Sequence, residues 1–320
     1  MFSTLYAPLI TFGISMIALV FLTKGKMTHL ALDQPNERSL HQTPVPRTGG
    51  IAIMAGIMAG WSLLGAPSWP VWLGLTILIL VSFLDDLYNI PVPLRFGTHF
   101  LGSLIFSASV LANSYLSILA ATIVFVWMIN LYNFMDGSDG LAGGMALFGF
   151  GFYALAAWVN KDMNFALLNM TIAASAGAFL FFNFHPARIF MGDAGSIPLG
   201  FLSASFGLMG WQRTDWPIWF PIMIFSPFIV DSTITLLKRL FKGEKIWKAH
   251  KEHYYQRLIR MGLGHRNLAL LEYALMISVG ISSLFAIHGS GVSQIAVFAG
   301  WGAAFIMIMH RIDKRWAGKN

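Results

Sequence analysis

The chain has 320 residues, of which 56% are hydrophobic and only 11% are charged. Soluble domains carry roughly 25% charged residues, so the composition excludes a soluble protein and predicts an all-α, polytopic integral membrane protein. The sequence contains no cysteine, which excludes disulfides and thiolate metal sites. The net charge is +7, but no nucleic-acid partner is expected because the chain has no soluble basic domain.

Eleven apolar runs along the chain are each expected to form a helix, and together they predict about 10–11 transmembrane helices. Nothing repeats at a fixed period and no low-complexity linker divides the chain, so we expect a single domain over residues 1–320. In chain order the runs are 3–23, 48–66, 70–84, 98–112, 116–130, 143–159, 164–182, 196–210, 216–237, 268–288 and 292–310.

The basic residues indicate how these helices cross the membrane. Lys24 and Lys26 follow the first run and none precedes it, which predicts a retained span with its N-terminus outside the cytoplasmic (inner) membrane. This orientation places 19 of the 21 Lys and Arg residues in cytoplasmic segments, where membrane insertion retains them. Those segments are 24–47, 85–97, 131–142, 183–195, 238–267 and the tail from 311.

Five aspartates fall in the three cytoplasmic segments 85–97, 131–142 and 183–195, whereas an ion pathway would place its carboxylates near mid-membrane. Two unit charges 4 Å apart cost about 4 kcal/mol at an effective dielectric near 20, so a converging cluster needs proton sharing or a bound cation. With amide oxygens from Asn130 and Asn133, the set suits a hard ion such as Mg²⁺. Helix and turn capping is the alternative for any single aspartate, but it explains the clustering poorly. The five are Asp85, Asp86, Asp136, Asp139 and Asp193; only Asp231 lies inside a predicted span.

Glycines accompany the acids in "DGSDGLAGG", residues 136–144, and in "FMGDAGS", residues 190–196. In the second stretch Gly192 and Gly195 allow close backbone approach, and the amides that open the next helix favour anions. Phe190 is expected to stack on a flat ring, with a membrane anchor as the alternative. Arg47, in the proline-rich segment before the second run, has the fork geometry that suits phosphate oxygens; cytoplasmic topology explains it equally well.

The stretch "KAHKEHYYQRL", residues 248–258, sets His250 and His253 three apart and Arg257 four further on. That spacing predicts one helical face. The pattern lacks the acid that a zinc protease needs, so we favour phosphate contacts over a structural or metal-binding role.

The chain resembles the polyprenyl-phosphate N-acetylhexosamine-1-phosphate transferases, of the glycosyltransferase family 4 type and the O-antigen-initiating branch. Five sequence blocks carry this resemblance and follow one another in the order found in that family. The resemblance covers nearly the whole chain. Known members transfer a sugar-1-phosphate from a UDP-sugar to undecaprenyl phosphate and release UMP, using Mg²⁺, with Mn²⁺ as a substitute, at the cytoplasmic face. The blocks are the segment from Asp33, Pro35 and Arg38 to Gly49 and Gly50, then Asp85-Asp86, "NLYNFMDGSDGLAGG", "FNFHPARIFMGDAGS" and the histidine segment.

The resemblance implies a role for each matching residue. Asp193 would bind the metal with Asn133 as a second ligand, and Gly137, Asp139 and Phe190 would meet the uracil. The remaining matching residues would be a catalytic or acceptor-positioning pair, Asp85 and Asp86, and a group lining the donor, Asn130, Asp136, Arg47, His250, His253 and Arg257.

Two departures from the family narrow the expectation. Arg95 stands where many members have a lysine after the double aspartate, and the histidine segment reads His-x-x-His instead of a triple-histidine run. The second departure argues against UDP-MurNAc-pentapeptide as donor and for an O-antigen-type initiator, for which the donor would be a UDP-N-acetylhexosamine. An aspartate-rich prenyltransferase and an ion-coupled transporter are the alternative functions, and a homodimer is left open.

Overall fold

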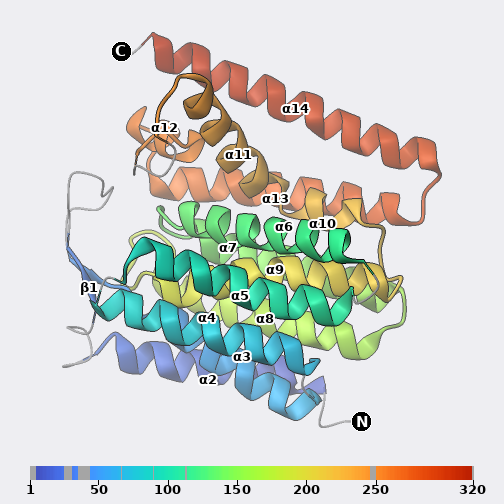
Figure 1. Cartoon of the computed structure of the whole chain (residues 1–320). Helices are drawn as coiled ribbons and strands as arrows, with labels where there is room; N and C mark the ends of the chain where they lie inside the picture. The colour runs from blue at the N-terminus through green and yellow to red at the C-terminus, as the bar shows by residue number, and fades with distance from the viewer. Residues whose placement is uncertain are drawn as a thin grey trace.

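The computed structural model describes residues 5–24, 31–34, 44–65, 67–88, 90–111, 114–245 and 250–318. They form a helical bundle with one antiparallel pair of two-residue strands, β1 (Leu32–Asp33) and β2 (Val45–Pro46) (Figure 1). The helices are α2 (Ala7–Leu22), α3 (Gly49–Leu64), α4 (Trp69–Tyr88), α5 (Val92–Val110), α6 (Tyr115–Phe134), α7 (Leu141–Val159), α8 (Met163–Asn183), α9 (Asp193–Gln212), α10 (Trp219–Ile224), α11 (Ser226–Phe241), α12 (Tyr254–Arg260), α13 (His265–Ile287) and α14 (Gly291–Ala317).

The all-α, polytopic architecture predicted from composition is confirmed. Among the described residues, six helices are long and apolar enough to cross a membrane: α4, α6, α7, α8, α13 and α14. The apolar helices α2 and α3 are shorter, at 16 residues each. Helices α7 and α8 form the centre of the bundle, with 67% of their apolar windows buried, whereas α14 lies at its edge with 6% buried (Figure 1).

The run 216–237, predicted as one span, is divided into α10 and α11. Phe225 separates the two helices, and Pro227 stands in the first turn of α11. Proline has no N–H to donate and its ring clashes with the preceding turn, so it is tolerated at a helix start but not in its interior.

Several predicted segment boundaries are wrong for a common reason. Asp85 and Asp86 lie within α4, which ends at Tyr88, and α5 begins at Val92. Most of the predicted loop 85–97 is therefore helical. Likewise α6 continues to Phe134, and Asp193 is the first residue of α9. Polar side chains that face other protein groups need not end a helix, so the helices extend past their apolar runs. Of the predicted segment 24–47, residues 25–30 and 35–43, which include Arg38 and His41, lie outside the described residues.

Candidate active site

The segments 46–50 and 190–191, which are far apart in the sequence, are hydrogen-bonded to each other at the candidate site. The Phe190 amide donates to the Pro46 carbonyl at 2.8 Å, and the Gly49 amide returns a bond to the Phe190 carbonyl at 2.9 Å. The Gly50 amide donates to the Met191 carbonyl at 2.8 Å. The start of α3 is thereby fixed beside the start of α9, at the end of the bundle where β1 lies (Figure 1).

Glycine is required where these two segments touch. Gly192 has φ +71°, and a Cβ there would lie 2.3 Å from the Arg47 carbonyl oxygen. A Cβ on Gly50 would lie 2.2 Å from the Gly195 amide nitrogen. Both distances are shorter than any real Cβ contact, so the close backbone approach predicted for Gly192 and Gly195 is confirmed.

Asp86 joins α4 to α9. Its carboxylate accepts hydrogen bonds from the backbone amides of Asp193, at 3.3 Å, and Ala194, at 3.0 Å. Both amides belong to the first turn of α9. Amides at a helix start have no partner within the helix, and the helix dipole favours an anion there. Arg47 adds an ion pair at 3.5 Å to Asp86 Oδ1 and donates to the Asp86 carbonyl at 2.8 Å.

Asp85 and Asp193 share a second arginine. Arg95 Nη1 lies 2.8 Å from Asp85 Oδ2, and its Nη2 lies 3.7 Å from Asp193 Oδ2. Asp193 Oδ1 accepts a hydrogen bond from Asn133 Nδ2 at 2.8 Å, and Asp85 Oδ1 accepts one from the Ile90 amide at 2.6 Å. Residues from α4, α5, α6 and α9 therefore meet around Asp193.

Asp136 adds a further carboxylate from the loop between α6 and α7. Its side chain approaches the Gly192 amide, which lowers its pKa, but burial is the larger effect and raises that pKa well above its usual value. The negative charges of Asp193, Asp86 and Asp33 raise it further. A raised pKa favours the protonated form of Asp136, which is the response expected of a buried acid among other carboxylates.

The donor set fits a hard cation. Within the described part of the chain, no three His, Asp or Glu side chains converge into a metal cage. Mg²⁺ needs no such cage, because it is usually held by one or two carboxylates and completes its shell with phosphates and water. Asp193 keeps 22% of its side chain exposed and stands beside other carboxylate oxygens, which is the donor chemistry that Mg²⁺ prefers. The Asn133 amide nitrogen, not its oxygen, faces Asp193, so its role as a second ligand stays a prediction.

Asp139, predicted to contact a uracil, has one of its two carboxylate oxygens hydrogen-bonded to other residues of the chain. Its Oδ2 lies 2.6 Å from His185 Nδ1 and accepts from the Ala187 amide at 3.1 Å. His265 Nδ1 lies 3.8 Å from Oδ1, and the two histidine rings stack with centroids 5.5 Å apart. Oδ1 has no protein donor within hydrogen-bond range in the described residues.

The other residues predicted for the donor differ in how close they lie to this cluster. Gly137 is exposed, and a Cβ added to it would lie 2.1 Å from the Tyr255 hydroxyl oxygen. Phe190 is half-buried in the segment that pairs with β2. Asn130 is buried one turn before Asn133 and donates to the Val126 carbonyl at 2.7 Å, which places its amide nitrogen within α6 and away from the acids.

The single helical face predicted for His250, His253 and Arg257 is wrong. Helix α12 begins only at Tyr254, and His253 precedes it as the N-cap with φ −57° and ψ 145°. The helix starts there because Asp231 Oδ1 and Oδ2 accept the amides of Tyr254 and Tyr255, each at 2.9 Å.

Arg257 faces the C-terminal helix. Its Nη1 lies 2.9 Å from Asp313 Oδ1, and its guanidinium stacks over the rings of Tyr254 and Trp316. Because these groups enclose it, Arg257 fixes α12 against α14, and a phosphate contact stays a prediction. His250 lies outside α12, where burial and the positive charge of His253 lower its pKa to about 4.

Comparison with known proteins assigns the family. The model of glycosyl transferase family 4 matches residues 68–210. The chain is 31% identical to the probable undecaprenyl-phosphate N-acetylglucosaminyl 1-phosphate transferase of Bacillus subtilis (strain 168), over 79% of this chain and 76% of the relative. It is 27% identical to the undecaprenyl-phosphate alpha-N-acetylglucosaminyl 1-phosphate transferase of Yersinia pestis, over 87% and 84%, and 26% identical to the decaprenyl-phosphate N-acetylglucosaminephosphotransferase of Mycobacterium leprae (strain TN), over 80% of each.

The chain belongs to the polyprenyl-phosphate N-acetylhexosamine-1-phosphate transferase family. It is therefore a membrane-embedded phosphoglycosyltransferase. The matched region 68–210 runs from α4 to α9 and contains the acids Asp85, Asp86, Asp136 and Asp193. The histidine segment and Arg47 lie outside it.

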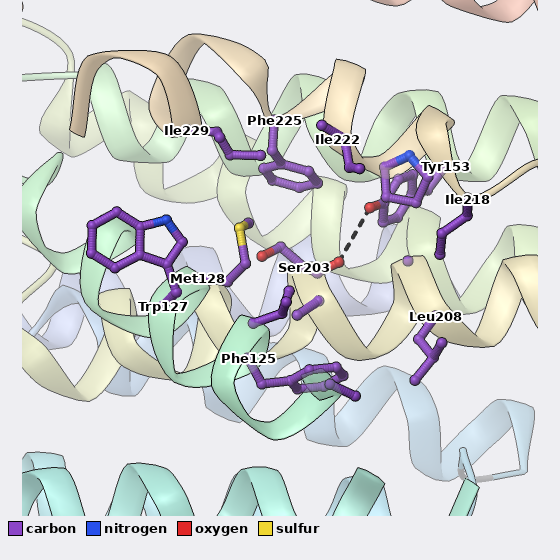
Figure 2. A pocket seen from close by; sticks show the side chains of 15 residues that line it. Phe125, Trp127, Met128, Tyr153, Ser203, Leu208, Ile218, Ile222, Phe225 and Ile229 are labelled. Atoms are coloured by element: carbon purple, nitrogen blue, oxygen red, sulfur yellow. Dashed lines mark hydrogen bonds between the residues drawn. The ribbon is translucent and has the colours of Figure 1, made fainter. Parts of the chain in front are cut away.

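The phosphoglycosyltransferase also has an apolar groove of about 400 Å³ between α6, α9, α10 and α11 (Figure 2). Trp127 and Met128 of α6 and Phe225 and Ile229 around the break between α10 and α11 line it. Met128 precedes Asn133 by five residues, which is about 8 Å along a helix. On α9 the first lining residue, Ser203, follows Asp193 by ten residues, about 15 Å along the helix, so the groove lies deeper in the bundle than the acids.

Sequence reasoning missed several groups that organise this phosphoglycosyltransferase. His185 and His265 orient Asp139, although His185 stands in the quoted block "FNFHPARIF". Asp313 binds Arg257, and nothing in the local sequence of either residue indicates that pairing. Asp231 was recognised only as an acid inside a span, and its N-capping role depends on contacts with a segment more than twenty residues away.

Proposed function

We propose that this enzyme transfers an N-acetylhexosamine-1-phosphate from a UDP-N-acetylhexosamine to undecaprenyl phosphate and releases UMP. The proposed role is the first membrane step of O-antigen or another cell-envelope polysaccharide. The observation that carries the proposal is the convergence of Asp85, Asp86, Asp136 and Asp193 at one end of a membrane bundle, supported by the names of the relatives.

The proposed site faces the cytoplasm of the inner membrane, and the N-terminus lies outside. The positive-inside rule supports this orientation, because the segments that the sequence predicts to be cytoplasmic hold 19 of the 21 Lys and Arg residues. A water-soluble nucleotide and a lipid-linked phosphate can meet only at such a surface.

Asp193 would hold Mg²⁺, with Asn133 as a second ligand, and Mn²⁺ would substitute for it. The cation would neutralise charge on the donor diphosphate as the phosphoryl group moves. Arg47 and Arg95, which already contact Asp86, Asp85 and Asp193, would place further positive charge beside that diphosphate.

The geometry favours direct transfer over a phosphorylated aspartate. An oxygen of the acceptor phosphate attacks the donor's β-phosphorus, and the bond from that phosphorus to the bridging oxygen breaks, so that UMP leaves with this oxygen. Asp86 uses both carboxylate oxygens to cap α9, and as a nucleophile it would have to give up at least one of these bonds. A phosphate monoester is already largely dianionic at neutral pH, since its second pKa is about 6, so no strong base is required.

The apolar groove supports a lipid acceptor. Apolar surface removed from water contributes about 25 cal/mol per Å², and the groove offers a wall of apolar side chains that begins on α6 at Met128, five residues before Asn133. A prenyl chain lying there would keep its phosphate at the polar end.

The test is purified protein with undecaprenyl phosphate, Mg²⁺ and a panel of UDP-sugars, scored for UMP release. Asp193→Ala should abolish turnover, and a chelator should do the same to the wild type until Mg²⁺ or Mn²⁺ is restored. Lys161→Asn, at an exposed position with φ 66° where asparagine is well tolerated, is the matched control. Near-normal activity of Asp193→Ala would refute the metal assignment, and the absence of UMP with every donor would refute the proposed reaction.

A further inference from the structure

An acid inside a helix that the chemistry above does not use is bonded to the histidine segment. Asp231, on α11, is buried with 6% of its surface exposed. Besides the two backbone amides at the start of α12, its Oδ1 lies 3.2 Å from His253 Nδ1 and accepts from the Thr235 hydroxyl at 3.2 Å. A buried carboxylate with four donors costs much to desolvate, so a purpose beyond capping one short helix is expected.

The contact with Asp231 determines which nitrogen of His253 carries the proton. An ionised carboxylate only accepts hydrogen bonds, so the contact with Asp231 requires the proton on Nδ1 of His253, whereas the capping-box contact of the His253 side chain with the Gln256 amide would require an unprotonated nitrogen. Asp231 and the Gln256 amide therefore favour opposite tautomers, and the charged carboxylate is taken as the stronger partner. In the neutral ring, Nε2 then carries the free lone pair. In the described residues no hydrogen bond is recorded to Nε2, and the ring is held between Phe134 and Tyr255, with centroids 6.0 and 5.9 Å away.

The same contacts bring His253 to the end of α6. Phe134, on which the ring stacks, follows Asn133, whose amide binds Asp193 at 2.8 Å. The Tyr255 hydroxyl donates to the Phe134 carbonyl at 3.0 Å, which ties α12 to the end of α6. His253 is therefore held against the end of α6, at the residue that follows Asn133 in the chain.

We propose that Asp231 is a positioning residue for the transfer reaction, which holds the His253 proton on Nδ1 and keeps Nε2 available for the substrate phosphates. This inference rests on the proposed function. Two arginines, Arg239 and Arg257, lie near the histidine pair. The ring of His250 lies 4.9 Å from that of His253, and with a pKa of about 4 it is uncharged at neutral pH. Glu252 binds Arg239 at 3.0 Å and offsets part of this positive charge.

A double-mutant cycle tests whether Asp231 acts through His253. Asp231→Asn keeps the size of the side chain but makes the amide a donor, which favours the other histidine tautomer. We expect kcat to fall by about 10²- to 10⁴-fold, the range for a carboxylate that orients a reacting histidine, with the KM for the UDP-sugar within about threefold of wild type. In the His253→Ala background, Asp231→Asn should have almost no further effect on kcat, because the residue through which it acts is gone.

Asp313→Asn is the matched control. It removes a carboxylate on the opposite side of α12, where Asp313 binds Arg257 and Lys238, and it leaves His253 untouched. A purely structural loosening of α12 should combine multiplicatively with His253→Ala. If Asp231→Asn also combines multiplicatively with His253→Ala, as Asp313→Asn is expected to, the positioning role is overturned.

A second variant covers the case in which Asp231→Asn does not fold. Thr235→Val keeps the carboxylate and removes only one donor from it, so the carboxylate should hold the His253 proton more tightly. The limb of the kcat–pH profile that is lost in His253→Ala should then move to higher pH, with KM unchanged. An unmoved limb would refute the inference even though the wild type releases UMP, whereas a wild type that releases none refutes the proposed function instead.

Discussion

Gly50→Ala tests whether the two backbone segments of the site truly touch. A Cβ at this position would lie 2.2 Å from the Gly195 nitrogen and 2.4 Å from its Cα. These are backbone atoms in the first turn of α9, so no side-chain rotation can relieve the overlap. The start of α3 must move away from α9 by more than an ångström, since ordinary contacts begin at 3.4 Å.

The expected loss of stability follows from that movement. Overpacking a tight contact costs about 1–3 kcal/mol, and the bonds from the Gly49 and Gly50 amides to residues 190 and 191 contribute about 1 kcal/mol each when lost. We therefore expect about 3 kcal/mol or more of destabilisation, which lowers the Tm of a chain of this size by roughly 6–12 °C. Because Arg47 and Asp193 lie on the separated segments, UMP release should fall as well.

The assay compares thermal unfolding in detergent with UMP release for the same preparation. Gly151→Ala is the control, because it lies inside α7 with nothing within 4 Å of the added methyl group, and alanine is favoured over glycine in a helix by about 0.5–1 kcal/mol. Gly151→Ala should match or exceed the wild-type Tm. A Gly50→Ala protein with unchanged Tm and activity would show that α3 and α9 do not cross at this distance.

Two further changes test the groove and the opposite end of the bundle. Ala204→Phe places a ring in the apolar groove and should raise the KM for undecaprenyl phosphate about tenfold while leaving that for the UDP-sugar unchanged; equal shifts in both would contradict a lipid groove. Burial, and then the charge of Asp162, raise the pKa of Asp215 from 3.8 to about 6, so stability should decline as the pH rises through that interval. Asp215→Asn should therefore raise the Tm at about pH 8 and not at about pH 4, and a lower Tm at pH 8 would disprove this account.

The fold was predictable because a bilayer imposes a strong and local rule. Each span needs about 20 apolar residues, so runs such as 116–130 and 143–159 appear directly in the sequence and correspond to α6 and α7. The meeting of distant acids was predictable for the same reason, since alternate helix ends must lie at the same face. Boundaries such as that of α4 were not, because Asp85 and Asp86 face protein groups and remain helical.

Pairings between distant polar residues had no comparable signal. Asp231 interrupts an apolar run and its partners are the amides of Tyr254 and Tyr255, which any residue would supply. Arg257 binds Asp313, 56 positions away, in the tail, where an acid among basic residues looks like an ordinary charged helix end. Such pairings depend on tertiary packing, and the helical spacing of His250, His253 and Arg257 was misleading because the cap at Asp231 determines where α12 begins.

The start of α9 determines how these parts work together. Asp86 caps this helix, Asp193 is its first residue, and Gly195 lies in its first turn against Gly50. Asp86, Asp193 and the arginines that pair with them, Arg47 and Arg95, are therefore held at the start of one helix, although they come from separate segments of the chain. A site fixed by a helix end can hold its charges in place before substrate arrives. That is why a methyl group at Gly50, which touches no substrate, is expected to impair the chemistry.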